Sequence, residues 1–317
     1  MKYKLLMAFS IVFLLYSCIQ EQEDTDLITI TKHIDNYLTQ SASNGFSGSV
    51  LVAKKGEIIL SKGYGWADRE NKIPNSPLTV FNIGSVTKQF TASAILKLVE
   101  QGKIKTSDKI SSFFDQAPID KRDITIHQLL THTSGISNRT GGFRYDEASK
   151  EQFLTEFFES ALQSEPGKKY QYANANYILL TAILESVSNQ TYGSFLQDYL
   201  FEPAQMKSTG YKSINFHTER LAHGYYYNRT DEQWADWGTT QQHLPYNNKH
   251  WYSIGKGDIH STVEDLYKWH VALEDNLVLT SKSRAVQETP HVAENDEMTS
   301  FYGYGWAISK TNRETKM

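Results

Sequence analysis

The order of strand-like and helix-like segments constrains the fold of this 317-residue chain more than any single motif does. Residues 46–53 and 58–66 are rich in β-forming side chains and flank a Lys-Lys-Gly-Glu turn, which predicts a β-hairpin. β character returns only at residues 302–309. Between these ends, apolar residues recur at helical spacing. We expect helices over residues 27–37, 87–101, 124–133, 150–162, 177–188, 192–199 and 263–273.

This order predicts an α+β fold, an α/β sandwich in which both chain ends build one antiparallel sheet. The long helical middle is then an insertion and not a second domain. The formal net charge is −4 and no long basic run occurs, which argues against nucleic acid as the main partner. The chain has one cysteine and no His-Glu-x-x-His pattern, so we expect neither a metal site nor a cofactor.

The first residues predict a targeting segment that precedes the fold. Residues 1–17 combine a short basic start with an apolar run too short to span a bilayer, as in a signal peptide. The run ends in Leu15-Tyr16-Ser17-Cys18, which resembles a bacterial lipoprotein box. We therefore expect lipid on Cys18, an acidic tether over residues 18–27, and an exported protein held at a cell-envelope membrane. The alternative is a plain secretory peptide with an incidental cysteine.

A Ser-x-x-Lys pattern, Ser85-Val86-Thr87-Lys88, opens one of the predicted helices. Residues three apart share a helical face, so the Lys88 amine can approach the Ser85 hydroxyl. A serine hydroxyl is a weak nucleophile that needs a base, and burial can lower the pKa of a lysine enough to serve. The pattern is short, however, and a helix cap followed by a solvated lysine would look the same.

The surrounding residues favour the catalytic interpretation. Residues 81–91, Phe-Asn-Ile-Gly-Ser-Val-Thr-Lys-Gln-Phe-Thr, resemble the nucleophile segment of the class C β-lactamase and D-Ala-D-Ala carboxypeptidase family. Residues 125–135 resemble the Leu-Leu-Thr-His-Thr-Ser-Gly element of that family, in which His132 is expected to be structural. Residues 201–209 and 257–266 resemble later structural stretches. The resemblance runs from about residue 45 to the end of the chain and implies a β-lactamase/transpeptidase-like domain over residues 28–317.

Tyr172-Ala173-Asn174 resembles the second catalytic motif of the same family. A phenol near Ser85 and Lys88 can take the proton of the nucleophile and pass it to the leaving group. Asn174 can bind the substrate carbonyl and help to fix Lys88. The alternative is a core tyrosine. The resemblance implies a serine hydrolase that forms an acyl-enzyme at Ser85 on a β-lactam, a D-Ala peptide or a small ester or amide.

One family motif is missing. A Lys-Thr-Gly or His-x-Gly strand should follow, but no such triplet occurs after Ser309. That strand supplies an oxyanion-hole donor, and losing one donor costs on the order of 10²–10³ in rate. We therefore expect a chain truncated at its C-terminus, without its last strands and helix. A second function stays open, a catalytically impaired, lipid-anchored protein that binds cell-wall peptide or penicillin. Trp234, Trp237 and Trp251 either line a substrate groove or fasten a loop.

Overall fold

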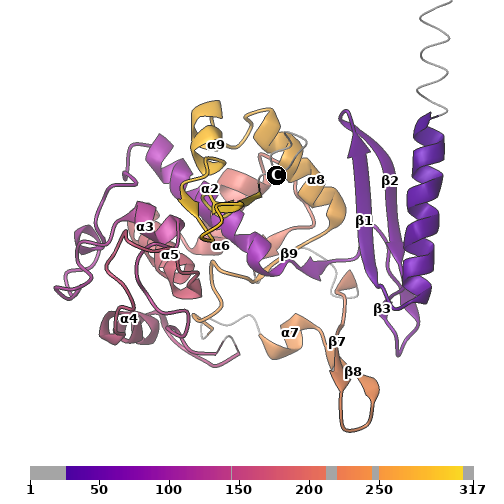
Figure 1. Cartoon of the computed structure of the whole chain (residues 1–317), viewed down its shortest axis with the longest axis horizontal. Coiled ribbons are helices and arrows are strands. Elements are labelled where there is room, and N and C mark those ends of the chain that lie inside the picture. The colour runs from indigo at the N-terminus through magenta and orange to yellow at the C-terminus, as the bar shows by residue number, and fades with distance from the viewer. Residues whose placement is uncertain (1–25, 144, 212–219, 245–249, 310–317) are drawn as a thin grey trace, which may run out of the picture. The chain divides into compact units, whose positions relative to one another are not determined.

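The computed structural model describes residues 26–143, 145–211, 220–244 and 250–309, which fall into two compact units, Met1–Thr79 and Val80–Met317 (Figure 1). The predicted signal peptide, Cys18 and the tether up to residue 25 lie outside the described residues and stay predictions. Residues 26 and 27 already belong to a helix. None of the helices in the described ranges has the length and apolar character needed to cross a bilayer.

The first unit consists of one helix and two small antiparallel ribbons. The helix covers residues 26–43, longer than the predicted 27–37. The predicted hairpin is confirmed as β1 (Gly48–Lys54) paired with β2 (Glu57–Tyr64). β3 (Trp66–Asp68) pairs with β4 (Ile73–Pro74). Asp35 fastens the helix to β2, since one carboxylate oxygen accepts hydrogen bonds from Lys62 and Tyr64, each at 2.7 Å.

The second unit holds the predicted helical middle. Its α-helices are α2 (Thr87–Glu100), α3 (Ile126–Leu130), α4 (Lys150–Glu159), α5 (Asn174–Ser188), α6 (Tyr192–Leu196), α7 (Thr240–His243), α8 (Val263–Glu274) and α9 (Ser281–Gln287). Two 3-10 turns are η1 (Gly84–Val86) and η2 (Ile110–Ser112), and the π-helical η3 (Gln197–Phe201) directly continues α6. The sequence pattern did not predict α7 and α9, which are only four and seven residues long.

Local capping interactions determine where the helices begin and end, and the apolar pattern alone predicts these ends less well. The helix predicted over residues 124–133 is only α3, because a capping box starts it: Thr125 accepts from the backbone of Gln128, whose side chain accepts from the Thr125 N–H. His132, at a positive φ of 57°, leaves the helical path soon after its end. In contrast, α5 begins at Asn174, three residues before the predicted start at residue 177.

Three small antiparallel sheets complete the described part of the second unit. One has the order β5 (Phe81–Asn82), β9 (Ile259–Ser261), β6 (Gly210–Tyr211). The second pairs β7 (Gly224–Asn228) with β8 (Gln233–Gly238). The third has the order β10 (Val292–Ala293), β11 (Ser300–Tyr302), β12 (Ala307–Ser309).

The α+β class is confirmed, but the expected single sheet built from both chain ends differs in detail. In the described residues, β1 and β2 form one sheet and β10 to β12 another. The strand predicted over residues 302–309 is also interrupted by a turn, in which Gly303 N–H donates to the Trp306 carbonyl. Gly305 has φ of 78°, and a Cβ there would lie 2.7 Å from the Lys88 carbonyl oxygen, so this turn presses closely on α2.

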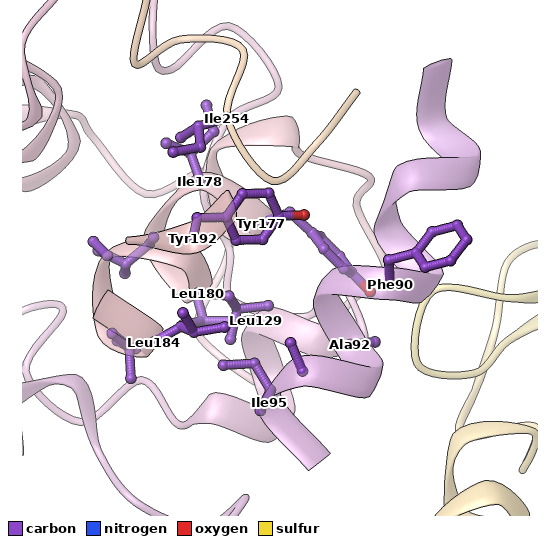
Figure 2. Close-up of a cluster of buried hydrophobic side chains, with 14 of the residues drawn as sticks. Phe90, Ala92, Ile95, Leu129, Tyr177, Ile178, Leu180, Leu184, Tyr192 and Ile254 are labelled. Carbon is purple, nitrogen blue, oxygen red and sulfur yellow. The ribbon is translucent and has the colours of Figure 1, made fainter. Parts of the chain in front are cut away.

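The core of the second unit surrounds α2 and α5. Figure 2 shows Ile95 of α2 beside the Tyr177 and Leu180 side of α5, whereas Phe90 of α2 points away from α5 and packs against Phe201 and Trp269; Phe90, Ile95, Tyr177 and Leu180 are all 0% exposed. Full burial of one such side chain contributes about 1.5–3 kcal/mol. Eleven of the fourteen residues of α2 are buried, so the helix that follows Ser85 is held on nearly all sides. This packing provides a rigid platform for the residues at its N-terminus.

Candidate active site

Ser85 lies in η1, the tight turn that leads into α2. Gly84 adopts φ of 53°, and its N–H donates to the side chain of Asn82 at the end of β5. The Ile83 N–H donates to the carbonyl of Ile259 in β9. These bonds fix the turn to the sheet, while Ser85 itself is exposed. The predicted nucleophile is therefore accessible and held by rigid elements.

Lys88 lies one turn further along, buried with 1% of its surface exposed. Its Nζ is 3.2 Å from Ser85 Oγ and donates to Asn174 Oδ1 and to the Lys256 carbonyl, both at 2.9 Å. Burial, and to a smaller degree the charge of Lys256, lowers the pKa of Lys88 to about 7. A lysine with this pKa is partly neutral near pH 7, which the predicted role of base requires.

Tyr172 and Asn174 reach the same point from the start of α5. The Tyr172 hydroxyl donates to Ser85 Oγ at 3.1 Å, and Lys88 Nζ lies 5.0 Å from the centre of the Tyr172 ring. Burial raises the pKa of Tyr172, an effect that its bond to Ser85 only partly offsets. Asn174 is the first residue of α5, and its Oδ1 is bonded to Lys88. All four predicted residues of the second unit, Ser85, Lys88, Tyr172 and Asn174, thus lie together.

We compared the chain with models of known protein families. A beta-lactamase family model matches residues 30–314. The chain belongs to the beta-lactamase family. This confirms the resemblance seen in the sequence and, with it, the β-lactamase/transpeptidase-like fold of a serine hydrolase.

Two penicillin-binding proteins are each about 30% identical in sequence to this beta-lactamase family chain. A putative penicillin-binding protein, PbpX of Bacillus subtilis (strain 168), is 31% identical over 290 residues, which are 92% of this chain and 68% of the relative. The crystal structure of a penicillin-binding protein from Bacillus halodurans has a TM-score of 0.74 and 30% identity, and covers 87% of this chain and 84% of its own.

A more distant structure shares the fold alone. A D-amino acid amidase from Ochrobactrum anthropi SV3, in complex with D-phenylalanine, has a TM-score of 0.73 at 23% identity and covers 91% of this chain and 82% of its own. The chain spans between 41% and 68% of the lengths of the first three curated relatives it matches.

His132 is completely buried beside the beta-lactamase family site, in keeping with the structural place expected for it. Its Nδ1 accepts a hydrogen bond from the Ala173 N–H at 3.2 Å. The ring centre lies 4.3 Å from that of Tyr172 and 5.1 Å from that of Tyr177. Burial and the nearby Lys88 charge hold the pKa of His132 well below its usual value.

The loop before β9 supplies contacts that the sequence did not predict. Besides the Lys256 carbonyl, the Gly255 carbonyl accepts from Thr91 Oγ1 in α2 at 2.7 Å. Gly255 has φ of 70°, and a Cβ there would lie 2.0 Å from Thr181 Oγ1 in α5. The loop is thus fastened to both helices. These contacts use backbone carbonyls, which carry no side-chain signature in a sequence.

The three tryptophans singled out in the sequence have different surroundings. Trp251 is buried, and Lys150 Nζ lies 5.1 Å from the centre of its ring. Trp237 stacks on His243 with ring centres 3.8 Å apart. Trp234 is exposed on β8 and packs edge-on against Tyr227. Trp251 therefore fastens a loop. The side chains that contact Trp234 and Trp237 lie in the β7–β8 hairpin or next to it.

Proposed function

We propose that the protein is a serine hydrolase that forms an acyl-enzyme at Ser85 on a strained or terminal amide or an ester, such as a β-lactam or a D-Ala peptide. The observation that carries this proposal is the set of partners around Lys88. Two of its three neighbours, Asn174 Oδ1 and the Lys256 carbonyl, can only accept hydrogen bonds. Neutral Lys88 has two N–H groups for these acceptors, so its lone pair is left for Ser85.

The reaction then follows from this orientation. The Ser85 hydroxyl gives its proton to Lys88 as Oγ attacks the substrate carbonyl. Collapse of the tetrahedral intermediate breaks the bond to the leaving group and forms the Ser85 ester. Water later attacks that ester, and Ser85 regains its proton. With a Lys88 pKa of about 7, a large part of the protein carries the neutral amine at neutral pH.

Tyr172 complements the base as a proton donor. Because its pKa is raised, the phenol stays protonated at neutral pH and is a poor initial base. Its hydroxyl is 3.1 Å from Ser85 Oγ, a position from which it can donate to the departing group and be reprotonated through Lys88. This refines the expectation that the phenol takes the nucleophile's proton: Lys88 accepts that proton, and Tyr172 delivers one to the leaving group.

Asn174 is proposed to contact the substrate. Its Oδ1 is occupied by Lys88, so the Nδ2 donors remain to meet a substrate carbonyl. The penicillin-binding names of the two relatives near 30% identity support a D-Ala peptide or a penicillin as substrate. The amidase and a hydrolase with promiscuous acyltransferase activity among the fold neighbours support the wider class of acyl compounds, amides and esters.

A covalent labelling experiment tests the proposal. The protein is incubated with a fluorescent penicillin, and the adduct is located by intact mass and peptide mapping, with Ser85→Ala as the control. We expect one adduct on Ser85 and none in the control. A well-folded protein that neither forms the adduct nor hydrolyses simple esters would overturn the proposal. Equal, reversible binding by both proteins without turnover would favour the impaired, peptide-binding relative instead.

Lipid attachment at Cys18, and with it export to the cell envelope, is also proposed, on the sequence of the lipoprotein box alone. Expression of the whole chain with Cys18→Ala should release the protein from the membrane fraction. Unchanged membrane association of this variant would contradict the lipid anchor.

A further inference from the structure

His132 is hydrogen-bonded to the backbone on both sides of Tyr172. Its carbonyl accepts a hydrogen bond from the Gln171 N–H at 2.8 Å. Its Nδ1 accepts the Ala173 N–H at 3.2 Å. His132 therefore accepts from the N–H groups of the residues immediately before and after the tyrosine, and its ring lies against the ring of that same tyrosine.

The neighbours of His132 decide its tautomer. Asn176 Nδ2 lies 3.3 Å from Nδ1, and Asn176 Oδ1 is occupied by the Ser134 hydroxyl at 2.7 Å. Both groups that face Nδ1, the Ala173 N–H and the Asn176 amide, are thus donors. Nδ1 must carry a lone pair, which places the single proton of a neutral ring on Nε2.

Nε2 is buried and has no hydrogen-bond partner among the described residues. The titratable groups that face the ring are Lys88 and the phenols of Tyr170, Tyr172, Tyr177 and Tyr302. No carboxylate is among them to stabilise a second charge on the ring. An unpartnered buried N–H and a positive φ of 57° both cost stability, and costs of this kind cluster where function requires them.

We propose that His132 is a positioning residue, a neutral imidazole that sets the backbone at Tyr172 so that the phenol and Asn174 reach Ser85 and Lys88 together. The inference deepens the proposed acyl-enzyme function and rests on it. His132 touches neither Ser85 nor a reacting atom, so it acts through the Tyr172-Ala173-Asn174 segment. Small misplacements of catalytic groups have large kinetic effects, about 10²-fold for 1 Å.

Two substitutions separate positioning from simple packing. His132→Asn keeps a hydrogen-bond acceptor close to the backbone, and asparagine tolerates a positive φ better than most residues. His132→Phe keeps a ring but leaves the Ala173 N–H without its acceptor. His127→Phe, the same change five residues earlier, is the matched control, because the His127 ring contacts Tyr304 and His291, which lie outside the Tyr172 segment.

The measurement is the rate constant of penicillin acylation, separated from the binding constant, over a range of pH. We expect His132→Phe to lower the acylation rate at least about tenfold with unchanged binding, and His132→Asn and His127→Phe to stay within about threefold of the parent protein. His132→Asn should also keep the acid limb of the pH profile in place, since burial and the nearby Lys88 charge hold the pKa of His132 well below its usual value.

Several results would overturn the inference. One is a His132→Phe protein as fast as the parent, and another is a His132→Asn protein that is slowed tenfold or loses its acid limb. If His132→Phe does not fold, the rate and pH profile of His132→Asn decide alone. Failure of the parent protein to form any Ser85 adduct would instead refute the proposed function, so the two failures are distinguishable.

Discussion

Two regions of the second unit are rich in tyrosine. In one region the tyrosines pack around a buried side chain, and in the other they are half exposed. Around His132, the rings of Tyr170, Tyr172, Tyr177 and Tyr302 enclose a buried imidazole, and Tyr177 donates to the Leu130 carbonyl at 2.9 Å. In the β7–β8 hairpin, Tyr226, Tyr227 and Trp234 are about half exposed, at 51%, 48% and 57%. Both regions are rich in aromatic residues, but only the first places a phenol beside an exposed serine, Ser85, and a buried lysine, Lys88.

The difference shows that burial, more than aromatic content, shifts the pKa values on which the proposed reaction depends. Desolvation lowers the pKa of Lys88 and raises that of Tyr172 in the first region. In the hairpin, Tyr227 lies directly opposite Trp234, with ring centres 5.8 Å apart. Such a cross-strand pair stabilises a ribbon by about 0.2–1 kcal/mol, and this contribution accounts for both side chains without a role in catalysis. Substitutions in the two regions should therefore have very unequal effects on activity.

The largest effect is expected at Lys88. Lys88→Arg keeps the positive charge but removes the lone pair, because a guanidinium does not lose its proton in proteins. The acylation rate should fall by about 10⁴, the upper range for loss of a general base. Stopped-flow measurement of penicillin acylation checks this. A Lys88→Arg protein within tenfold of the parent would show that charge, and not a lone pair, is what Ser85 requires.

Tyr172→Phe should have the next largest effect. The ring and its contact with His132 remain, and only the hydroxyl that donates to Ser85 Oγ is lost. We expect a loss of about 10²–10³ in rate, the usual contribution of one positioned proton donor. The loss should be smaller for substrates with a good leaving group, such as activated esters, than for amides. Equal loss for both substrate types would argue against a role in leaving-group protonation.

The pH dependence should follow Lys88. Below its pKa of about 7 the amine is protonated and has no lone pair, so acylation should slow as the pH falls through that value and level off above it. Lys256→Met removes a cation that lowers the Lys88 pKa and should move the acid limb toward higher pH. A rate independent of pH between 5 and 9 would contradict a titrating base in this region.

The smallest effect is expected in the hairpin. Trp234→Ala should change the acylation rate by less than about threefold and lower the free energy of unfolding by about 0.2–1 kcal/mol, the range of one cross-strand pair. Thermal denaturation and the same acylation assay measure both quantities. A large rise in KM for a peptide substrate, without loss of stability, would break the comparison and make the hairpin part of the binding surface.

Much of the site could be predicted from the sequence because its side chains sit in short, local motifs. Ser85 and Lys88 are one helical turn apart, and Tyr172 and Asn174 are two residues apart, so each pair needs only its own helix end. The Lys256 carbonyl could not be predicted in this way, since any residue offers a carbonyl and its place depends on a loop held by Gly255 and Thr91. The short helix α9 and the turn at Gly305 were missed because they depend on tertiary packing and have too few residues for a periodic pattern.

The protonation of Lys88 is the most direct test of the account. Selective ¹³C labelling of lysine methylene carbons, with Lys88→Arg to assign the signal, would follow the titration of this one amine by NMR. We expect a pKa of about 7, well below the 10.5 of an ordinary lysine. A Lys88 signal that titrates near 10.5 in the folded protein would contradict the claim that a buried, neutral amine activates Ser85.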